Sequence, residues 1–205
     1  MVNGANGDAL STVDAYDSTL THTTPTALAI PGSELAAESN GNHAIFAGGN
    51  TTSGVLSAYD ASLTRSLPAS LSVSRNRLAA ASAGNYILFA GGYSSGGNGP
   101  TDMVEAYDMF LTRTMPEQLS VAKGMLKGTT TKGNALFAGG STAYSFSAIN
   151  TVDSYDAFLV HTVQTSMGQN RHSHFAVSID EYALFGGGVN EREKDLNSVE
   201  AYRYV

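Results

Sequence analysis

Three basic residues recur at one register position of the sequence. Arg75, Lys123 and Arg171 each stand 14 residues before the Phe of a Phe-x-Gly-Gly motif, and Gly32 holds the same position in an earlier copy. Equivalent positions in a repeat lie at one face of the molecule, so the three cations are expected to converge there. Such a cluster could bind a carboxylate, a sulfate or an acidic sugar, with Arg offering bidentate geometry. The alternative is that they cap strand ends or pair with neighbouring carboxylates.

Two histidines next to the last of these cations suggest a metal site. His172 and His174 alternate, and alternate residues of a strand share a face, so both rings could bind one ion. However, His174 occupies the register of Leu78 and Leu126, which is an inner core position, and the spacing fixes no acidic third ligand. We therefore predict no metal and no other cofactor. His172 remains a candidate ligand-binding residue at the rim of the proposed face.

Aromatic residues also mark two polar loops that follow double glycines. Tyr93 opens a loop rich in Ser, Gly and Asn, and Tyr144 and Phe146 lie in the next such loop. Exposed rings beside small polar residues are typical of surfaces that contact sugars or proteins. These three residues are therefore candidate ligand-binding residues, and ordinary surface variability is the alternative.

The elements that must position these residues form an internal repeat. The Phe-x-Gly-Gly motifs begin at Phe46, Phe89, Phe137 and Phe185, so the last two intervals are equal and the first is slightly shorter. A Tyr, usually followed by Asp, precedes each Phe at one constant distance, at Tyr16, Tyr59, Tyr107 and Tyr155. The variation in length falls between the double glycine and the next Tyr, which is typical of a constant scaffold with one variable loop per unit.

Each unit is predicted to contain four short strands. In the clearest copy these are Leu78–Ser82, Asn85–Ala90, Val104–Tyr107 and Leu111–Thr114. The first two are joined by a Gly-Asn turn, a strong hairpin signal, and the Asp after each Tyr is expected to cap turn N–H groups. The continuous apolar strand before each double glycine is expected to be buried on both faces. The same pattern across the chain predicts seventeen strands.

The glycines and tyrosines of the repeat have a structural interpretation. Paired glycines at a strand end let neighbouring backbones approach and adopt dihedral angles that a Cβ forbids. The tyrosines recur at a packing position. The residues assigned this role are Gly48, Gly49, Gly91, Gly92, Gly139, Gly140, Gly187, Gly188, Tyr59, Tyr107 and Tyr155.

Together these motifs resemble the Kelch repeat, in particular the Trp-poor form found in bacterial and phage-associated proteins. The resemblance implies an all-β propeller of four-stranded blades, in one domain spanning residues 1–205. The expected units are 1–31 (partial), 32–74, 75–122, 123–170 and 171–205 (partial). Kelch units usually carry a Trp in the fourth strand, and this sequence has none. Kelch domains often bind partners through the connections between blades and the loops after the glycines.

About four blades leave the closure of the ring open. Kelch propellers usually have about six or seven blades, so the chain is a partial ring, a compact closed ring, or a ring completed by a second copy. Unpaired edge strands associate readily, which favours completion by a second copy, giving a homo-oligomer, or by a further segment.

The amino-acid composition limits which partners and which cellular location are expected. Eighteen acidic residues against eleven basic ones give a net charge of −7, without the basic clusters that nucleic acids require. No apolar run is long enough to insert into a membrane. The first ten residues, MVNGANGDAL, show no signal peptide. The compartment stays open, with an extracellular, cell-surface or virion-associated location favoured over the cytoplasm.

The sequence therefore predicts a non-catalytic recognition module that binds a glycan or a protein surface. There is no Cys for a Tyr–Cys copper site and no Trp for the Asp-box of sialidases. The alternatives are a lyase or hydrolase acting on anionic carbohydrate, and a structural module of a larger surface or virion assembly.

Overall fold

The computed structural model describes residues 9–51, 53–144 and 147–204. This part of the chain consists of strands, turns and irregular segments, with no helix among the described residues. No described segment is thus a helix that is long and apolar enough to cross a membrane.

Most of the strands form a two-stranded ribbon and four larger antiparallel sheets, and each is built from consecutive parts of the chain. The ribbon pairs β1 (Ala15–Tyr16) with β2 (His22–Thr23). The next sheet contains β3 (Leu35–Ser39), β4 (His43–Gly48), β5 (Ser57–Asp60) and β6 (Arg65–Ser66). It is followed by a sheet of β8 (Ala79–Ala83), β9 (Tyr86–Ala90), β11 (Val104–Tyr107) and β12 (Arg113–Thr114).

The remaining sheets continue the same order. One contains β13 (Lys127–Thr131), β14 (Asn134–Ala138), β15 (Val152–Tyr155) and β16 (His161–Gln164). The last has three strands, β17 (Phe175–Ile179), β18 (Tyr182–Gly186) and β19 (Val199–Arg203). Two short strands, β7 (Arg75–Asn76) and β10 (Tyr93–Ser94), pair separately near the ends of the larger sheets.

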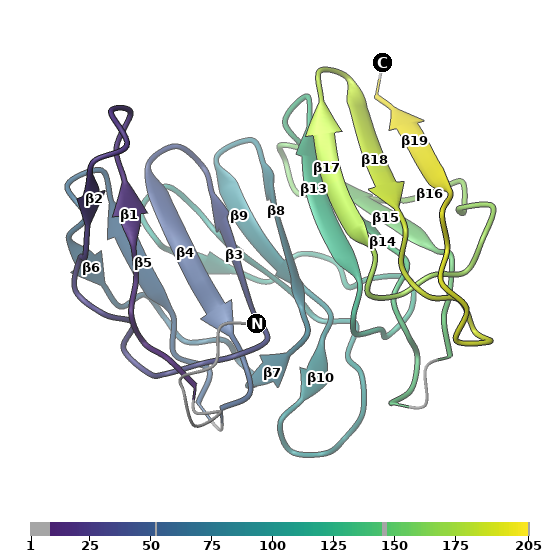
Figure 1. Cartoon of the computed structure of the whole chain (residues 1–205), viewed down its shortest axis with the longest axis horizontal. Helices are drawn as coiled ribbons and strands as arrows, with labels where there is room; N and C mark the ends of the chain where they lie inside the picture. Colours follow the sequence, from purple (N-terminus) through teal and green to yellow (C-terminus); the bar gives the residue numbers. More distant parts are fainter. Residues whose placement is uncertain (1–8, 52, 145–146, 205) are drawn as a thin grey trace.

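The sheets stand side by side in chain order, from the β1–β2 ribbon at the left of Figure 1 to the β17–β19 sheet at the right. The first strands of successive sheets contact one another, β3 with β8, β8 with β13 and β13 with β17. The β1–β2 ribbon and the β17–β19 sheet therefore lie at opposite ends of the row (Figure 1).

The core lies between neighbouring sheets. Ala79, Ala81 and Ala83 of β8 pack in one cluster with Leu126 and Phe137 from the following sheet. Small side chains on one sheet thus pack against large side chains of the next sheet, which keeps the interface dense.

The repeated tyrosines and glycines fill the structural roles that the sequence predicted. The hydroxyl of Tyr107 donates to the carbonyl of Ala69 at 2.8 Å, and that of Tyr155 donates to the carbonyl of Glu117 at 2.8 Å. Both acceptors lie in the segment leading from the preceding sheet. All eight glycines of the double-glycine motifs have positive φ. A Cβ on Gly91 would lie 2.5 Å from the carbonyl oxygen of Lys123, so only glycine fits there.

The strands that the repeat predicted are present, with shorter outer strands. Leu111, predicted to begin a strand, instead adopts a left-handed φ of 64° in a turn, and β12 begins at Arg113. The carboxylate of Asp108 accepts the N–H groups of Phe110 and Thr112, both at 2.8 Å, and so holds the turn closed. The predicted role of this Asp as a turn cap is confirmed.

Candidate functional site

One end of the row carries both the connections between sheets and the variable loops. The N–H of Gly49 donates to the carbonyl of Arg75 at 3.0 Å, and that of Gly92 donates to the carbonyl of Lys123 at 2.9 Å. The double glycine that opens each variable loop is thereby bonded to the segment leading into the next sheet. The connections and the loops meet at the same end.

Four residues form a hydrogen-bonded backbone rim at this end. Glu34, Arg77, Met125 and Ser173 hold equivalent register positions, and all have left-handed φ values of 60°, 51°, 56° and 53°. From the second member onward, each N–H donates to the carbonyl of the preceding member, with distances of 3.0, 2.9 and 3.1 Å along the series. Left-handed backbone at non-glycine residues is uncommon and strained, and it clusters at functional positions.

The four rim residues line a hollow of about 470 Å³, which we call the rim pocket. Leu35, Leu78 and Leu126 supply apolar walls, and His174 lines it as well. A pocket with apolar walls and a few polar groups at its mouth is a common form of ligand site.

The polar groups of the rim pocket carry both signs of charge. The guanidinium of Arg77 donates from Nε at 3.0 Å and from Nη2 at 2.9 Å to one carboxylate oxygen of Glu34. Lys127 is exposed beside them at the start of β13. This arrangement offers hydrogen bonds and one ammonium group to a polar ligand. The hydroxyl of Ser173, which also lines the pocket, lies 3.1 Å from Nδ1 of His172.

The three repeated cations do not face this pocket, which corrects the cationic face expected from the sequence. The side chains of Arg75 and Lys123 are fully buried and pair with fully buried carboxylates, Glu105 at 3.2 Å and Asp153 at 2.7 Å. The buried side chain of Arg171 pairs with Glu200 at 2.9 Å. The alternative that they pair with neighbouring carboxylates is the observed one, because a buried charge requires a close opposite charge.

Each pair belongs to a larger polar cluster. The carboxylate of Asp153 also accepts the N–H of Ser120 at 2.8 Å and lies 2.9 Å from the His161 ring. Burial raises the pKa of this carboxyl, but the charge of Lys123 and the hydrogen bonds from Lys123, Ser120 and His161 together lower it by more, so the pKa lies below its ordinary value.

The earliest copy of this cluster is electrically neutral. Gly32 replaces the cation and Ser57 replaces the carboxylate, and the N–H of Ala29 donates to the Ser57 hydroxyl at 3.0 Å. The two positions therefore change together along the chain, which is what a structural ion pair requires. That internal pairing between distant positions is a signal that sequence reasoning could have used.

The two histidines do not share a strand face. Ser173 between them has a left-handed φ of 53°, and β17 begins only at Phe175, so the alternation of an extended strand does not apply. The N–H of His172 donates to the carbonyl of Val189, and burial lowers the pKa of its ring. His174 is buried like the leucines of its register, and burial lowers its pKa to about 3. Within the described ranges, no three His, Asp, Glu or Cys side chains form a group able to hold a metal ion.

The aromatic loop residues are placed differently from one another. Tyr93, expected to be exposed, is buried against Gly124, and its hydroxyl donates to the carbonyl of Ala143 at 2.9 Å. Its ring stacks on that of Tyr144 with centroids 4.3 Å apart, so the two loops are joined by this contact. Tyr144 is half-exposed, and Phe146 lies outside the described residues.

Sequence reasoning missed the rim residues themselves. Glu34, Arg77, Met125 and Ser173 differ in type from unit to unit, so no repeated motif marks them. Their common features are a position two residues after the repeated cation register and the left-handed backbone, which only the structure shows.

Comparison with known proteins gives the fold alone. No family model matches the sequence, and no curated protein matches it. Solved structures do match, and one of them is the structure of YjhT, with a TM-score of 0.71 at 12% sequence identity. The match covers 94% of this chain and 75% of YjhT. The chain is thus an all-β protein whose sheets are arranged as in YjhT.

Proposed function

We propose that this protein is a Kelch-like propeller module that recognises a glycan or a protein surface through the rim pocket and the neighbouring loops. The observation that carries the proposal is the rim itself. Four equivalent backbone positions hold the same left-handed geometry while their side chains differ completely, as Glu34, Arg77, Met125 and Ser173. The side chains of Glu34 and Arg77 are partly exposed and that of Ser173 is exposed, so these positions present different groups at one end of the row.

The chemistry of the pocket supports recognition of a polar ligand. Arg77, Glu34 and Ser173 present donors and acceptors at the mouth, and Lys127 adds an exposed ammonium group. Apolar walls of leucine beneath polar groups suit the faces and hydroxyls of a sugar chain, or a polar side chain with an aliphatic stem. The variable loops at the same end enlarge the surface that a macromolecular ligand would contact.

Two lysines at opposite ends of one strand test the proposal. Lys127 begins β13 at the pocket, whereas Lys132 lies in the turn after β13 and makes an exposed contact with Asp180. Affinity electrophoresis in gels containing uronate, sulfated or neutral polysaccharides measures retardation of the wild-type protein and of each variant. We expect Lys127→Ala to weaken retardation several-fold and Lys132→Ala to leave it unchanged.

The outcomes separate the candidate functions. Equal retardation of both variants and the wild type would place binding away from the rim pocket. Release of new sugar ends during incubation would indicate the lyase or hydrolase alternative instead. Absence of retardation by every polysaccharide would remove the glycan half of the proposal and leave a protein surface as the ligand.

A further inference from the structure

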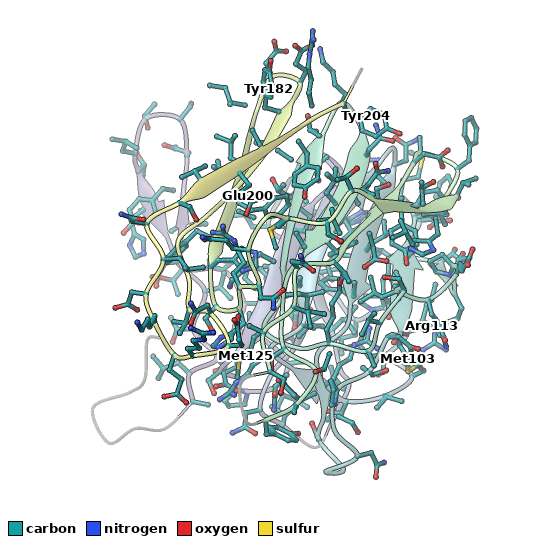
Figure 2. The ribbon with its side chains drawn as sticks, turned by 90° about the vertical axis from the view of Figure 1, so that its right-hand side faces the viewer. Met103, Arg113, Met125, Tyr182, Glu200 and Tyr204 are labelled. Carbon is teal, nitrogen blue, oxygen red and sulfur yellow. The ribbon has the colours of Figure 1, made fainter. Side chains whose placement is uncertain are left out.

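The last sheet exposes a face whose equivalent in the sheet of β8, β9, β11 and β12 is buried. Phe175, Val177 and Ile179 on one face of β17 are 79%, 60% and 64% exposed. Their register equivalents on β8 are Ala79, Ala81 and Ala83, which the following sheet covers. Figure 2 looks onto this end of the row, with Glu200 and β19 toward the viewer and no further sheet in front. The end face is large, apolar and built for packing against another sheet.

The double glycine of this sheet leaves space for the backbone of a further unit, and no described residue occupies that space. Gly91 and Gly139 each leave room for a carbonyl of the next unit, which would lie 2.5 Å from an added Cβ. At the equivalent Gly187, the nearest described atom to an added Cβ is the carbonyl oxygen of Leu196, 3.8 Å away and in the same unit. Gly187 thus keeps a backbone conformation that would let a neighbouring carbonyl approach, but no described residue of another unit approaches it.

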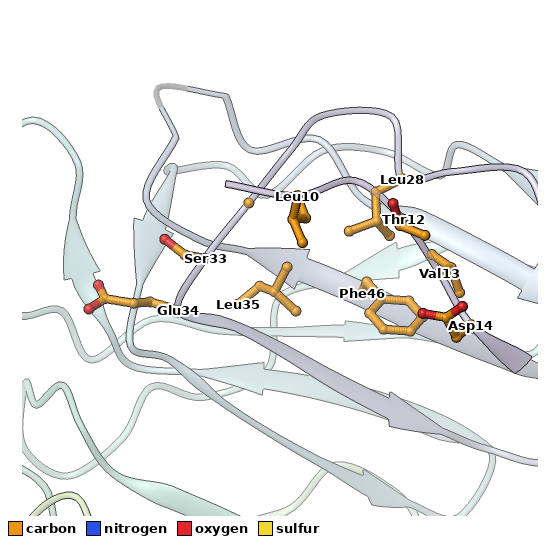
Figure 3. Close-up of a pocket in the computed structure, with 10 residues that line it drawn as sticks. Leu10, Thr12, Val13, Asp14, Leu28, Ser33, Glu34, Leu35 and Phe46 are labelled. Carbon is orange, nitrogen blue, oxygen red and sulfur yellow. The ribbon is translucent and has the colours of Figure 1, made fainter. Parts of the chain in front are cut away.

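The opposite end of the row has an apolar cavity. A cavity of about 590 Å³ lies between the β1–β2 ribbon and the β3–β6 sheet, and Leu10, Leu28, Leu35 and Phe46 point into it (Figure 3). The equivalents of Leu35 and Phe46 two units later are Leu126 and Phe137, which pack on the inner strands of the preceding sheet. Among the described residues, the ribbon occupies the positions of the third and fourth strands, and the cavity lies where the two inner strands stand in the other units.

The segment that ends in β1 is nearly identical in sequence to β19. Residues 13–16 read Val-Asp-Ala-Tyr, and residues 199–202 read Val-Glu-Ala-Tyr. In β19, Glu200 pairs with Arg171 at 2.9 Å and accepts the N–H of Gly168, and the hydroxyl of Tyr202 donates to the carbonyl of Thr165 at 2.8 Å.

The matching residues at β1 do not make these contacts. Asp14 is 57% exposed in its side chain and pairs with exposed His22, whereas its equivalents Glu105 and Asp153 each hold a buried cation. Tyr16 is 66% exposed, although the other four repeat tyrosines each reach a carbonyl of the preceding segment. Strand β1 thus carries the side chains of a third strand without the first two strands beside it.

We propose that a second copy of this chain completes both ends by strand exchange. The β1–β2 ribbon of one copy pairs with β18 of the other in the place of β19, which makes a four-stranded sheet in the order β17, β18, β1, β2. The paired β17 and β18 fill the 590 Å³ cavity, and their apolar face is covered by Leu35 and Phe46. Asp14 takes the place of Glu200 beside Arg171, and Tyr16 takes the place of Tyr202 at the carbonyl of Thr165.

The chain itself identifies the occupant. The contacts that Asp14 and Tyr16 lack are those that Glu200 and Tyr202 of β19 make at the other end of the same chain. Exchange therefore releases β19 and gives its place to a near-identical strand that brings β2 with it. The two ends face apart in one molecule (Figure 1). Because the contact joins different surfaces of the two copies, it is heterologous. It closes into a ring if the rotation between copies permits and otherwise extends into a chain of copies.

Engineered cysteines test the exchange directly, because the natural sequence has no Cys. Ala201 of β19 lies opposite Leu184 of β18, and Ala15 is its equivalent in β1. We expect Ala15→Cys combined with Leu184→Cys to form disulfides between chains under mild oxidation, seen as covalent dimers or larger species on denaturing gels. Light scattering of the wild-type protein should give at least twice the 21.3 kDa mass of one chain.

The matched control is Ala201→Cys combined with Leu184→Cys. Oxidation should tie β19 to β18 within one chain, block the exchange and reduce the solution mass to that of a monomer. The proposal is overturned if the wild type is monomeric and the Ala15/Leu184 pair does not crosslink. It is equally overturned if that pair crosslinks only within single chains, since the chain would then close on itself. None of these readouts involves a ligand, so they stand apart from the test of the rim pocket.

Discussion

Arg75, Lys123 and Arg171 show that one residue type at a repeated position can stabilise a repeat without contacting a ligand. Each lies in the segment leading into a sheet and reaches a carboxylate on the third strand of that sheet. The neutral copy, Gly32 with Ser57, keeps the hydrogen bond from a backbone N–H and dispenses with both charges. The cluster therefore holds the connection against the sheet, and we call it the tether. The tether can be charged or neutral, provided that the cation and the carboxylate are replaced together.

This tether predicts the effect of removing one charge. Lys123→Met leaves the fully buried carboxylate of Asp153 without its cation, and breaking one side of a buried ion pair costs about 3–5 kcal/mol. Denaturant unfolding of the variant measures the loss. The double variant Lys123→Met with Asp153→Ser should recover part of it, because serine still accepts the N–H of Ser120. An unchanged unfolding midpoint for Lys123→Met would show that Lys123 is solvated and would restore it as a ligand candidate.

At the scale of the element, each sheet is terminated by a double glycine that fixes where the next sheet packs. The first glycine leaves space for a backbone carbonyl, and the N–H of the second donates to that carbonyl, as Gly92 does to Lys123 at 2.9 Å. The inner strand can therefore be continuous and apolar, since its end is held by backbone contacts rather than by side chains. The turn after the third strand is fixed separately, by the Asp carboxylate that accepts two N–H groups.

Two glycines with similar dihedral angles separate these effects. Gly91 and Gly133 both have positive φ, 63° and 73°, but only Gly91 meets a neighbouring backbone, whereas no described atom lies within 4 Å of a Cβ on Gly133. Gly133→Ala should cost about 1 kcal/mol from left-handed strain. Gly91→Ala should cost about 3 kcal/mol because overpacking against Lys123 adds to the strain. Equal losses in thermal or denaturant unfolding would contradict the close approach of the two sheets.

At the scale of the whole molecule, stability depends on the stack of sheets, each of which is covered by the next. His174 lies where the last two sheets meet, 5.9 Å from the ring of Phe185, at a position where the other units have leucine. Its two ring nitrogens have no hydrogen-bond partner among the described residues, and burial holds its pKa near 3. A neutral buried histidine therefore links the packing of the row to pH.

The sign of this linkage follows from the two pKa values. The pKa of His174 is about 3 in the folded protein and about 6.5 when exposed, so the unfolded chain binds the extra proton between these values. Stability should fall by about 1.4 kcal/mol per pH unit below pH 6.5 from this residue alone. His174→Leu should remove that dependence and make the protein about 2 kcal/mol more stable than the wild type at pH 5, relative to their difference at pH 7. Parallel pH profiles of the two proteins would contradict the buried, neutral ring.

The sequence by itself determined the repeat, the number of strands in its units, and the structural roles of the glycines, tyrosines and turn aspartates. These features depend on local signals: apolar runs, positive-φ residues and turn chemistry within a few residues of one another.

Only the tertiary structure decided which polar residues reach the surface. Lys123 and Asp153 are distant in the sequence, and their burial depends on a sheet packing over them, which no local pattern records. Tyr93 was buried by contact with the next variable loop, and Ser173 broke the alternation of the two histidines by its backbone angle. The rim pocket and the uncovered ends likewise arise from how the sheets are placed in the row. A repeat specifies each unit and its neighbour contacts, whereas the exposed surfaces are whatever those contacts leave uncovered.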